Sequence, residues 1–280
     1  MLASPARAQV ACGDVVRGMV TLEQDLTCAT EPGLTVRGQL DMNGFTLRCD
    51  GTARGIVLAG RRSGLQNGEV ENCDEAVVLN GRGRHEVVRV GARGTTFGFL
   101  LNTGSNRLVL NTASAVDGDA FRVAGRSNYL VENEVEQAGD DGFDIKGRNN
   151  TVTRSVITGV AGTGIEVNGK RNVILANTVV AAGEGGIQLQ VGGNRVIGNT
   201  LTRSTVGLLV QNKGNEILGN VVLANRGTGI QVSFDSKGNR IIGNEAEGNG
   251  TDMLDEAANC GTNLWQGNVF GVVEPAACIN

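Results

Sequence analysis

Short apolar segments recur along the chain at a nearly constant spacing of 21 or 22 residues. Each segment has the pattern apolar-x-apolar and follows a small residue, as Ile165-Glu166-Val167 follows Gly164. A period this strict indicates a solenoid, in which each repeat forms one turn that contacts only its neighbours. The first apolar positions of the repeats are Leu34, Ile56, Val77, Phe99, Phe121, Phe143, Ile165, Ile187, Leu208 and Ile230.

A second pattern pairs asparagines within each repeat. Two asparagines flank a short apolar stretch, as in Asn194-Arg195-Val196-Ile197-Gly198-Asn199. Identical amides on strands that stack about 4.8 Å apart can hydrogen-bond along the stack, so this pattern predicts asparagine ladders. The second asparagine of the pair recurs at Asn111, Asn133, Asn177, Asn199, Asn220, Asn244 and Asn268.

The composition favours strands over helices in each repeat. The 280 residues include 43 Gly and only 3 Pro, and no sustained i, i+3, i+4, i+7 apolar pattern occurs. Alternate side chains of a strand face the core, so Phe143 and Ile145 are expected inside and Asp144 in solvent. We therefore predict an all-β, single-domain, right-handed parallel β-helix of about twelve turns.

Charge and hydropathy restrict the partners and the compartment. A net charge of -4 and an aromatic content of 3% argue against a nucleic-acid groove, and no segment is long enough to span a membrane. Residues 1–8 end in Ala6-Arg7-Ala8, which is similar to a secretory cleavage site. We expect a signal-peptide remnant at 1–8, a β-helix over 9–280, and a secreted or periplasmic protein. The alternative for residues 1–8 is an ordinary disordered terminus, and the sequence leaves the oligomeric state open.

The six cysteines lie towards the two ends of the chain. They lack the paired short spacings of a zinc site. We expect disulfides that staple the ends of the solenoid, where strand edges are unpaired. Many pairings are possible, and free thiols are the alternative. The expected pairs are Cys12 with Cys28, Cys49 with Cys73, and Cys260 with Cys278.

Residues one period apart become neighbours on adjacent turns, so the sequence can be read as a surface map. The outward position of successive turns carries Arg122, Asp144, Glu166 and Gln188, whereas two of the three turns before them carry valine there and the third leucine. The bends before the same strands add further carboxylates, and all of them are expected to gather on one patch. These additional residues are Asp117, Asp119, Asp140 and Asp141.

Adjacent carboxylates repel one another, and a hard cation that prefers oxygen ligands relieves the repulsion. We therefore predict a Ca²⁺ site formed by the aspartates of this patch. Its predicted ligands are Asp117, Asp119, Asp140, Asp141 and Asp144. In the alternative interpretation the aspartates only form turns, and Arg122 and Lys146 neutralise Asp144.

The segment Asp140-Asp141-Gly142-Phe143-Asp144 resembles the DDGWD segment of family nine polysaccharide lyases, calcium-dependent pectate lyases built on a right-handed β-helix. In that family the three aspartates of the segment bind Ca²⁺. A fourth acidic ligand comes from one turn earlier, which here corresponds to Asp117 or Asp119. The resemblance implies β-elimination of an acidic, uronate-containing polysaccharide.

The chain departs from that family at the catalytic base. The family has a lysine at the outward position of a later turn, where this chain has Glu166 and Gln188. Removal of the proton α to a uronate carboxylate requires a base, and a cation stabilises the resulting charge. Lys146 and Arg122 are the remaining catalytic candidates, with Lys146 as a mere ion-pair partner of Asp144 or Asp141 as the alternative. Contacts with the substrate are expected from Glu166, Gln188 and Lys170.

The two ends of the chain resemble those of secreted bacterial right-handed β-helix repeat proteins, often labelled NosD-like. The resemblance rests on Cys12-Gly13-Asp14 near the start and Asn259-Cys260-Gly261-Thr262-Asn263 near the end. It implies the fold and export, and no particular activity.

Three functions are compatible with these patterns. The first is Ca²⁺-assisted β-elimination, the second is a non-catalytic polysaccharide-binding or cell-surface module, and the third is a glycoside hydrolase or epimerase. Paired carboxylates permit hydrolysis, and the arrangement resembles polygalacturonase-type β-helices, which also use a histidine. The only histidine, His85, is expected in an exposed column with Arg107 and Tyr129, and Trp265 is expected to cap the core.

Overall fold

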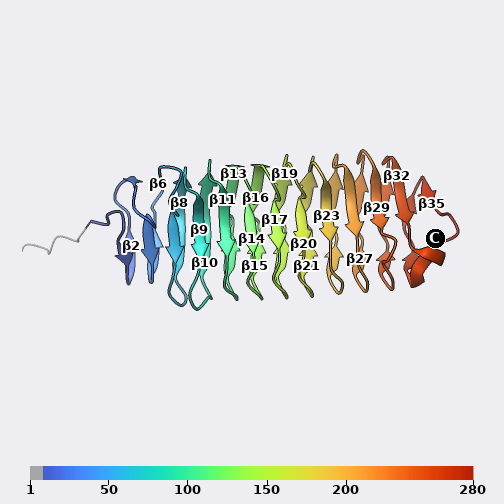
Figure 1. Ribbon diagram of the computed structural model, residues 1–280, viewed down its shortest axis with the longest axis horizontal. Helices are drawn as coiled ribbons and strands as arrows, with labels where there is room; N and C mark the ends of the chain where they lie inside the picture. The colour runs from blue at the N-terminus through green and yellow to red at the C-terminus, as the bar shows by residue number, and fades with distance from the viewer. Residues whose placement is uncertain (1–8, 280) are drawn as a thin grey trace, which may run out of the picture.

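The computed structural model describes residues 9–279, except for the side chains of residues 260 and 261. Figure 1 shows a rod in which the chain advances along one axis from the blue turns at the N-terminal end to the red turns at the C-terminal end. Successive turns pair in parallel, and the longest sheet has 13 strands. The predicted all-β parallel β-helix is therefore confirmed. No helix in the described part of the chain is long and apolar enough to cross a membrane.

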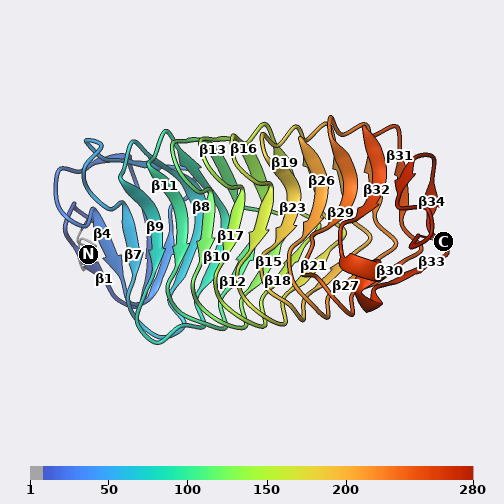
Figure 2. The same ribbon diagram turned by 45° about the vertical axis from the view of Figure 1, so that its right-hand side comes forward.

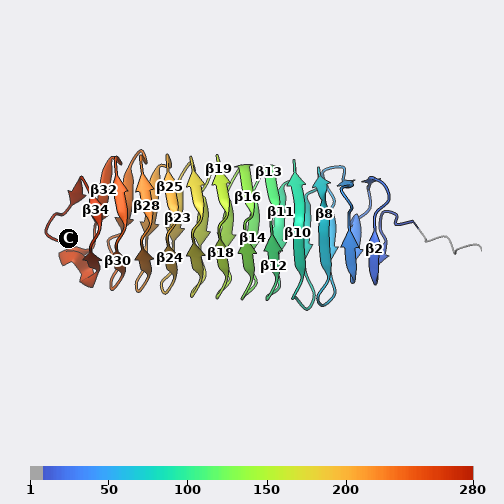
Figure 3. The same ribbon diagram turned by 180° about the vertical axis from the view of Figure 1, so that it is seen from behind.

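Each complete turn contributes strands to three parallel stacks, which Figure 2 shows obliquely and Figure 3 shows from behind. The first stack carries the outward column expected from the sequence. Its strands are β1 (Val15–Val16), β4 (Leu34–Val36), β7 (Ile56–Leu58), β9 (Glu75–Leu79), β11 (Phe97–Leu101), β14 (Phe121–Val123), β17 (Phe143–Ile145), β20 (Ile165–Val167), β23 (Gly185–Leu189), β26 (Val206–Val210), β29 (Thr228–Val232), β32 (Thr251–Asp255) and β35 (Val273–Glu274).

The second stack follows the first after a short bend. Its strands are β2 (Met19–Thr21), β5 (Gln39–Asp41), β8 (Gly64–Glu71), β10 (Glu86–Arg93), β12 (Arg107–Val109), β15 (Tyr129–Val131), β18 (Thr151–Thr153), β21 (Val173–Leu175), β24 (Arg195–Ile197), β27 (Glu216–Leu218), β30 (Arg240–Ile242) and β33 (Leu264–Gln266).

The third stack completes each turn, and β8 and β10 are long enough to belong to it as well. Its other strands are β3 (Leu26–Thr27), β6 (Thr46–Arg48), β13 (Thr112–Val116), β16 (Glu134–Ala138), β19 (Val156–Thr158), β22 (Thr178–Val180), β25 (Thr200–Thr202), β28 (Val221–Leu223), β31 (Glu245–Glu247) and β34 (Val269–Phe270). A 3₁₀ helix, η1 (Ala258–Thr262), lies near the C-terminal end.

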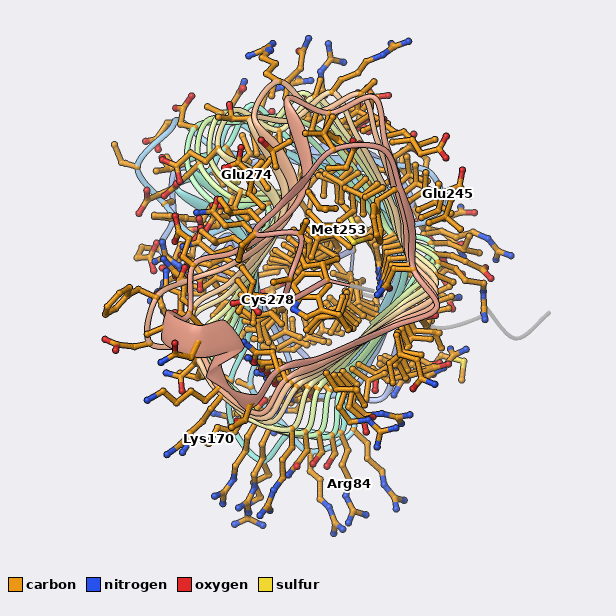
Figure 4. All side chains as sticks on the ribbon, turned by 90° about the vertical axis from the view of Figure 1, so that its right-hand side faces the viewer. Arg84, Lys170, Glu245, Met253, Glu274 and Cys278 are labelled. Atoms are coloured by element: carbon orange, nitrogen blue, oxygen red, sulfur yellow. A yellow bond between two sulfur atoms is a disulfide. The ribbon has the colours of Figure 1, made fainter. Side chains whose placement is uncertain are left out.

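The predicted register of the first stack is confirmed turn by turn. Leu34 pairs with Ile56, Phe121 with Phe143, and Leu208 with Ile230. Figure 4, which looks along the rod axis, shows side chains filling the interior. Phe99, Phe121 and Phe143 are buried and stack with ring centroids 4.7 and 4.6 Å apart. The identical side chains of successive turns therefore form one continuous core.

The predicted asparagine ladder is confirmed, and it satisfies backbone groups at a bend. The Oδ1 of Asn199 accepts the backbone N–H of Asn177 at 2.8 Å. Its Nδ2 donates to the carbonyl of Ile174 at 2.9 Å and to Oδ1 of Asn220 at 2.9 Å. A second ladder, formed by the first asparagine of each repeat, follows the same rule, as Asn172 donates its N–H to Asn194 at 2.8 Å. The ladders thus provide partners for buried backbone groups of the bends.

His85 lies in this second ladder, and the prediction that it is exposed beside Arg107 and Tyr129 is wrong. Arg107 pairs with Glu86 because this turn is one residue shorter. The backbone N–H of His85 therefore donates to Oδ1 of Asn106 at 2.8 Å, and the residue is 1% exposed. Its Nε2 lies 2.6 Å from the carbonyl oxygen of Asn80. Burial lowers the pKa of His85.

The N-terminal end of the core is stapled as predicted. Disulfides join Cys12 to Cys28 and Cys49 to Cys73. The third expected pair includes Cys260, whose side chain lies outside the described residues, as does the segment 1–8, so both remain predictions. Trp265 is 3% exposed in the last complete turn, and its Nε1 donates to Oδ2 of Asp255 at 2.8 Å.

We expect that Asn199→Ala lowers the free energy of unfolding by about 2–4 kcal/mol, because it leaves buried backbone groups on two turns unsatisfied. Chemical denaturation monitored by circular dichroism measures this loss. The control is Asn102→Ala, which removes an exposed amide contact with Asn80 and should cost less than about 0.5 kcal/mol. Equal losses in the two variants would contradict the stabilising role of the ladder.

Candidate functional site

The outward column of the first stack brings four polar side chains onto adjacent turns. Arg122 on β14 pairs with Asp144 on β17, Asp144 with Glu166 on β20, and Glu166 with Gln188 on β23. The same column is apolar on the preceding turns, where Val57, Val78 and Leu100 form a small buried cluster. The predicted change of character at Arg122 is confirmed.

Arg122 is fixed between an aromatic ring and two carboxylates. Its Nε lies 2.7 Å from Oδ2 of Asp119 and 3.8 Å from Oδ2 of Asp144. Its guanidinium carbon lies 4.3 Å from the ring centroid of Phe97, in a cation–π contact. Gly118 leaves room for this ring, since a Cβ there would lie 2.6 Å from Cε1 of Phe97. The guanidinium is therefore held in place before any ligand arrives.

Asp144 points outward as predicted, but the expectation that it faces solvent is wrong. It is 3% exposed because its neighbours cover it. Nζ of Lys146 lies 2.6 Å from its Oδ2, which confirms that Lys146 is on the same face. The other oxygen, Oδ1, is buried without a hydrogen-bond partner. A buried carboxylate oxygen without a donor is costly, so this atom marks a position for a ligand.

Asp119 and Asp141 form a short acidic ladder at the bend before the first stack. Oδ1 of Asp119 accepts the backbone N–H of Asp141 at 3.3 Å, and Oδ1 of Asp141 accepts that of Thr163 at 2.7 Å. Burial raises the pKa of Asp119, although Arg122 opposes the shift. Burial, followed by the charges of Glu166, Asp140 and Asp119, raises the pKa of Asp141 to about 8. Negative charge is thus in excess here.

Glu166 and Gln188 extend the polar surface by two turns. Oε2 of Glu166 accepts a hydrogen bond from Nδ2 of Asn168 at 2.6 Å, and Oε1 accepts one from Nε2 of Gln190. Burial and the nearby charge of Asp144 raise the pKa of Glu166. Oε1 of Gln188 accepts a hydrogen bond from Thr163 Oγ1 at 3.5 Å.

The carboxylates converge in two overlapping clusters. Ligand atoms of Asp119, Asp140 and Asp141 lie within 4.8 Å of one another, and so do those of Asp141, Asp144 and Glu166. Of the five predicted metal ligands, Asp117 belongs to neither cluster and is exposed. Glu166 takes its place as a potential ligand.

An open groove of about 470 Å³ runs beside the column, along the bend between the first and second stacks. Its lining includes Lys146 and Lys170, together with Arg126 and Arg148. The floor is formed by glycines, and a Cβ on Gly147 would lie 1.8 Å from the carbonyl oxygen of Gly125. Only glycine permits this close stacking of backbones. Lys146 therefore belongs both to the ion pair with Asp144 and to the lining of the groove.

Sequence reasoning missed Phe97 and the groove. Phe97 begins β11, the strand that carries Leu100 of the outward column, so the map of one position per turn did not include it. The sequence feature that could have predicted the contact between Phe97 and Arg122 is Gly118. It lies one turn after Phe97 and close to Arg122 in the sequence. The groove glycines recur once per turn at Gly125, Gly147 and Gly169, but a period cannot show which backbones approach one another.

We expect the stability of the protein to fall as pH rises from about 4 to about 8. In this window native Asp141 retains a proton that the unfolded chain releases, since its pKa is raised to about 8 in the native state. The free energy of unfolding therefore decreases as pH rises. Asp141→Asn removes the ionisation while its amide oxygen can still accept the Thr163 N–H. This variant should therefore melt higher than the wild type above pH 8, by at least about 3 °C.

The difference in Tm should shrink towards pH 4. Thermal melts in the presence of a chelator measure it, and Asp117→Asn, which changes an exposed carboxylate outside both clusters, is the matched control. Parallel pH profiles of Asp141→Asn and the wild type would show that Asp141 is ionised like an ordinary carboxylate.

Comparison with known proteins places the fold among right-handed β-helices. No curated protein sequence matches the chain. Among solved structures, the A-module of Azotobacter vinelandii mannuronan C-5 epimerase AlgE6 has a TM-score of 0.69 at 17% identity, covering 92% of this chain and 86% of that one. The periplasmic alginate epimerase AlgG has a TM-score of 0.60 at 13% identity, covering 94% and 79%.

A mannuronic acid specific polysaccharide family 6 lyase from human gut microbiota is also similar, with a TM-score of 0.53 at 13% identity and coverage of 90% and 70%. At such identities the likeness shows the fold alone. These matches do not confirm the resemblances to pectate lyases and to NosD-like proteins. Residues 97–270 match the family described as "Right handed beta helix region". Because this match spans more than half of the 280 residues, the chain belongs to the right-handed β-helix family.

Proposed function

We propose that the protein acts on an acidic, uronate-containing polysaccharide by removing the proton α to a uronate carboxylate, with β-elimination as the outcome. The observation that carries this proposal is the Lys146–Asp144 pair, in which an exposed amine lies 2.6 Å from a buried carboxylate at the edge of an open groove. A base beside a fixed cation is what this chemistry requires.

Arg122 supplies the fixed cation in this proposal. Its Nε contacts Asp119 and Asp144, which leaves its terminal amino groups for a substrate carboxylate. A guanidinium binds a carboxylate with two parallel hydrogen bonds. It also stabilises the negative charge that develops on that carboxylate when the α proton leaves. The contact with Phe97 and Asp119 keeps this donor in position, so little reorganisation is needed.

Lys146 is an ammonium in its ion pair with Asp144, so it first releases a proton to solvent and then acts as the base in its amine form. The proton on the α carbon moves to Nζ. The electron pair of the broken C–H bond forms a carbon–carbon double bond, and the glycosidic bond at the β position breaks. The released glycosidic oxygen takes a proton from solvent. Asp144 orients the amine, while Glu166, Gln188 and Lys170 contact the sugar units on neighbouring turns.

Epimerisation is the second candidate, because it begins with the same proton transfer. The carbanion is then protonated from the opposite face and no glycosidic bond breaks. Two of the structurally similar proteins are alginate epimerases and another is a mannuronic acid specific lyase, so both outcomes occur on this fold. Hydrolysis has less support, since Asp119 and Asp144 are buried and paired with cations. A non-catalytic binding module remains the alternative in which no product forms.

A Ca²⁺ ion fits the donor set of this site. The residues that would hold it are Asp140, Asp141, Asp144 and Glu166, whose carboxylates belong to the two overlapping clusters, and Oδ1 of Asp144 lacks a donor. Calcium accepts six to eight oxygen ligands in flexible geometry. When bound, it would supply positive charge near the substrate carboxylate. Arg122 and Lys146 already offset part of the negative charge, so the cation adds to a partly neutralised site.

We also propose an extracellular or periplasmic location. The two disulfides in the described part of the chain support an oxidising compartment, and one similar structure is a periplasmic enzyme. An acidic polysaccharide would be encountered there.

We expect Lys146→Arg to lower kcat by about 10²- to 10⁴-fold while KM changes little, because arginine retains the ion pair with Asp144 but cannot give up its proton. Ultraviolet absorbance of unsaturated products from polygalacturonate and alginate measures β-elimination. Reaction in deuterated water, followed by NMR of the α position, detects epimerisation.

The control is Lys237→Arg, which makes the same change, with the positive charge retained, at an exposed lysine in a distant bend. Wild-type turnover in Lys146→Arg would show that Lys146 is not the base. Binding without product by the wild-type protein would favour the non-catalytic module.

We expect Ca²⁺ to raise the Tm of the wild-type protein by at least about 3 °C relative to a chelated sample, because binding to the native state stabilises it. Asp144→Asn should abolish this shift, and Asp117→Asn should retain it. Differential scanning calorimetry measures the shift and isothermal titration calorimetry measures binding. No shift and no binding heat would exclude the Ca²⁺ site.

A further inference from the structure

The bend between the first and second stacks carries an edge of basic side chains, here called the basic edge. It comprises the bends at residues 60–63, 81–84, 103–106, 125–128, 147–150, 169–172, 191–194, 212–215 and 234–238. Backbone hydrogen bonds keep these bends in register, as Ser127 donates to the carbonyl of Arg148 at 3.1 Å and Asn149 to that of Lys170 at 3.1 Å. Figure 4 shows nitrogen-tipped side chains fanning outward where Arg84 and Lys170 are labelled.

Basic residues are concentrated on this edge, whereas the protein as a whole is acidic. Exposed lysines or arginines occur in seven of the nine bends, and Asp235 is the only acidic residue in them. At about 4.8 Å per turn, the basic edge is roughly 40 Å long. Representative residues from its N-terminal to its C-terminal end are Arg62, Arg84, Arg126, Arg148, Lys170 and Lys213.

The cations of the basic edge have no acidic partner, although several arginines on other surfaces do. Arg107 pairs across turns with Glu86, and Arg195 with Glu216. Within residues 9–279, none of the lysines and arginines of the basic edge forms such an ion pair. Closely spaced unpaired cations repel one another, and a ligand that supplies negative charge along the rod would relieve the repulsion.

Backbone conformation adds an independent observation. Arg62, Arg84 and Arg171 have φ values of 60°, 61° and 60°. Later turns place glycine at this position, as in Gly193 and Gly214. A left-handed conformation costs an arginine more than a glycine, so the charge is kept at these positions despite a local conformational cost.

We propose that the basic edge holds the anionic polysaccharide outside the reacting segment, with the polymer lying parallel to the rod axis. The identity of the polymer rests on the proposed function. The groove supports this occupant, because it continues from Arg126, Arg148 and Lys170 to Lys146. A polymer on the basic edge would therefore reach the reacting pair. Nucleic acid is less suited, since single strands bind by stacking on aromatic side chains, and Phe234 is the only aromatic residue in these bends.

The test separates binding at the distant part of the basic edge from the chemistry at Lys146. The N-terminal variant is Arg61→Gln, Arg62→Gln and Arg84→Gln combined. The matched control removes three ion-paired arginines from other surfaces, Arg107→Gln, Arg154→Gln and Arg195→Gln. Isothermal titration calorimetry with long-chain polyuronate and with uronate trimers, at low and at physiological ionic strength, measures the affinities.

We expect the N-terminal variant to bind the long chain about tenfold more weakly at low ionic strength. Its affinity for trimers and its turnover of trimers should match the wild type, and the control should retain long-chain affinity. Lys213→Gln combined with Lys237→Gln provides a second variant at the other end and should also weaken long-chain binding. Circular dichroism confirms the fold of each variant.

Equal losses in the control and the N-terminal variant, or long-chain affinity that does not depend on salt, would overturn the inference. Displacement of polyuronate by double-stranded DNA at equal charge concentration would also overturn it, in favour of a nucleic-acid surface. Salt-dependent long-chain binding that needs the basic edge, without any product from wild-type protein, would support the inference and refute the catalytic proposal.

Discussion

The hydrogen bonding of each turn to the next is the interaction on which the rest of the structure depends. A turn contacts only its neighbours, so it cannot bury its apolar side chains alone. Its strands pair in parallel, and its bends are held by asparagine ladders that accept backbone N–H groups from the turn before. A slip of one residue would exchange inward and outward side chains. Register therefore determines both the core and the surface.

The candidate site lies where this regular scheme changes its chemistry. At the bend before the first stack, Asp119 and Asp141 form a ladder of carboxylates, each of which accepts a backbone N–H from the following turn. A carboxylate accepts a backbone N–H as an amide oxygen does, but it lacks the donors of an amide and carries charge. The result is a group of partly buried carboxylates with raised pKa values. Proteins retain such energetically unfavourable groups of buried carboxylates mainly at functional sites.

Positive charge is distributed in two ways around these carboxylates. Arg122 forms an ion pair with Asp119, and Lys146 forms one with Asp144. Both cations are part of the site. The lysines and arginines of the basic edge remain unpaired in the described structure and extend over most of the rod. Lys146 lies at the boundary, since it belongs to the ion pair and also lines the groove. A polyanion that crosses from the basic edge to the outward column would therefore meet cations throughout, with the buried carboxylates beneath.

The 22-residue period and the side-chain alternation were enough to predict the fold, the pairing of Arg122 with Asp144 and of Asp144 with Glu166, and the asparagine ladder. These features depend on local periodicity, and stacking converts a sequence separation of one period into contact. The sequence did not reveal that Asp144 is buried, that His85 occupies a ladder position, or that Phe97 contacts Arg122. Burial depends on how long side chains from several turns fold over one another, and one shorter turn pairs Glu86 rather than His85 with Arg107. Such contacts join residues that are not separated by one period in the sequence. Only the tertiary structure decides them.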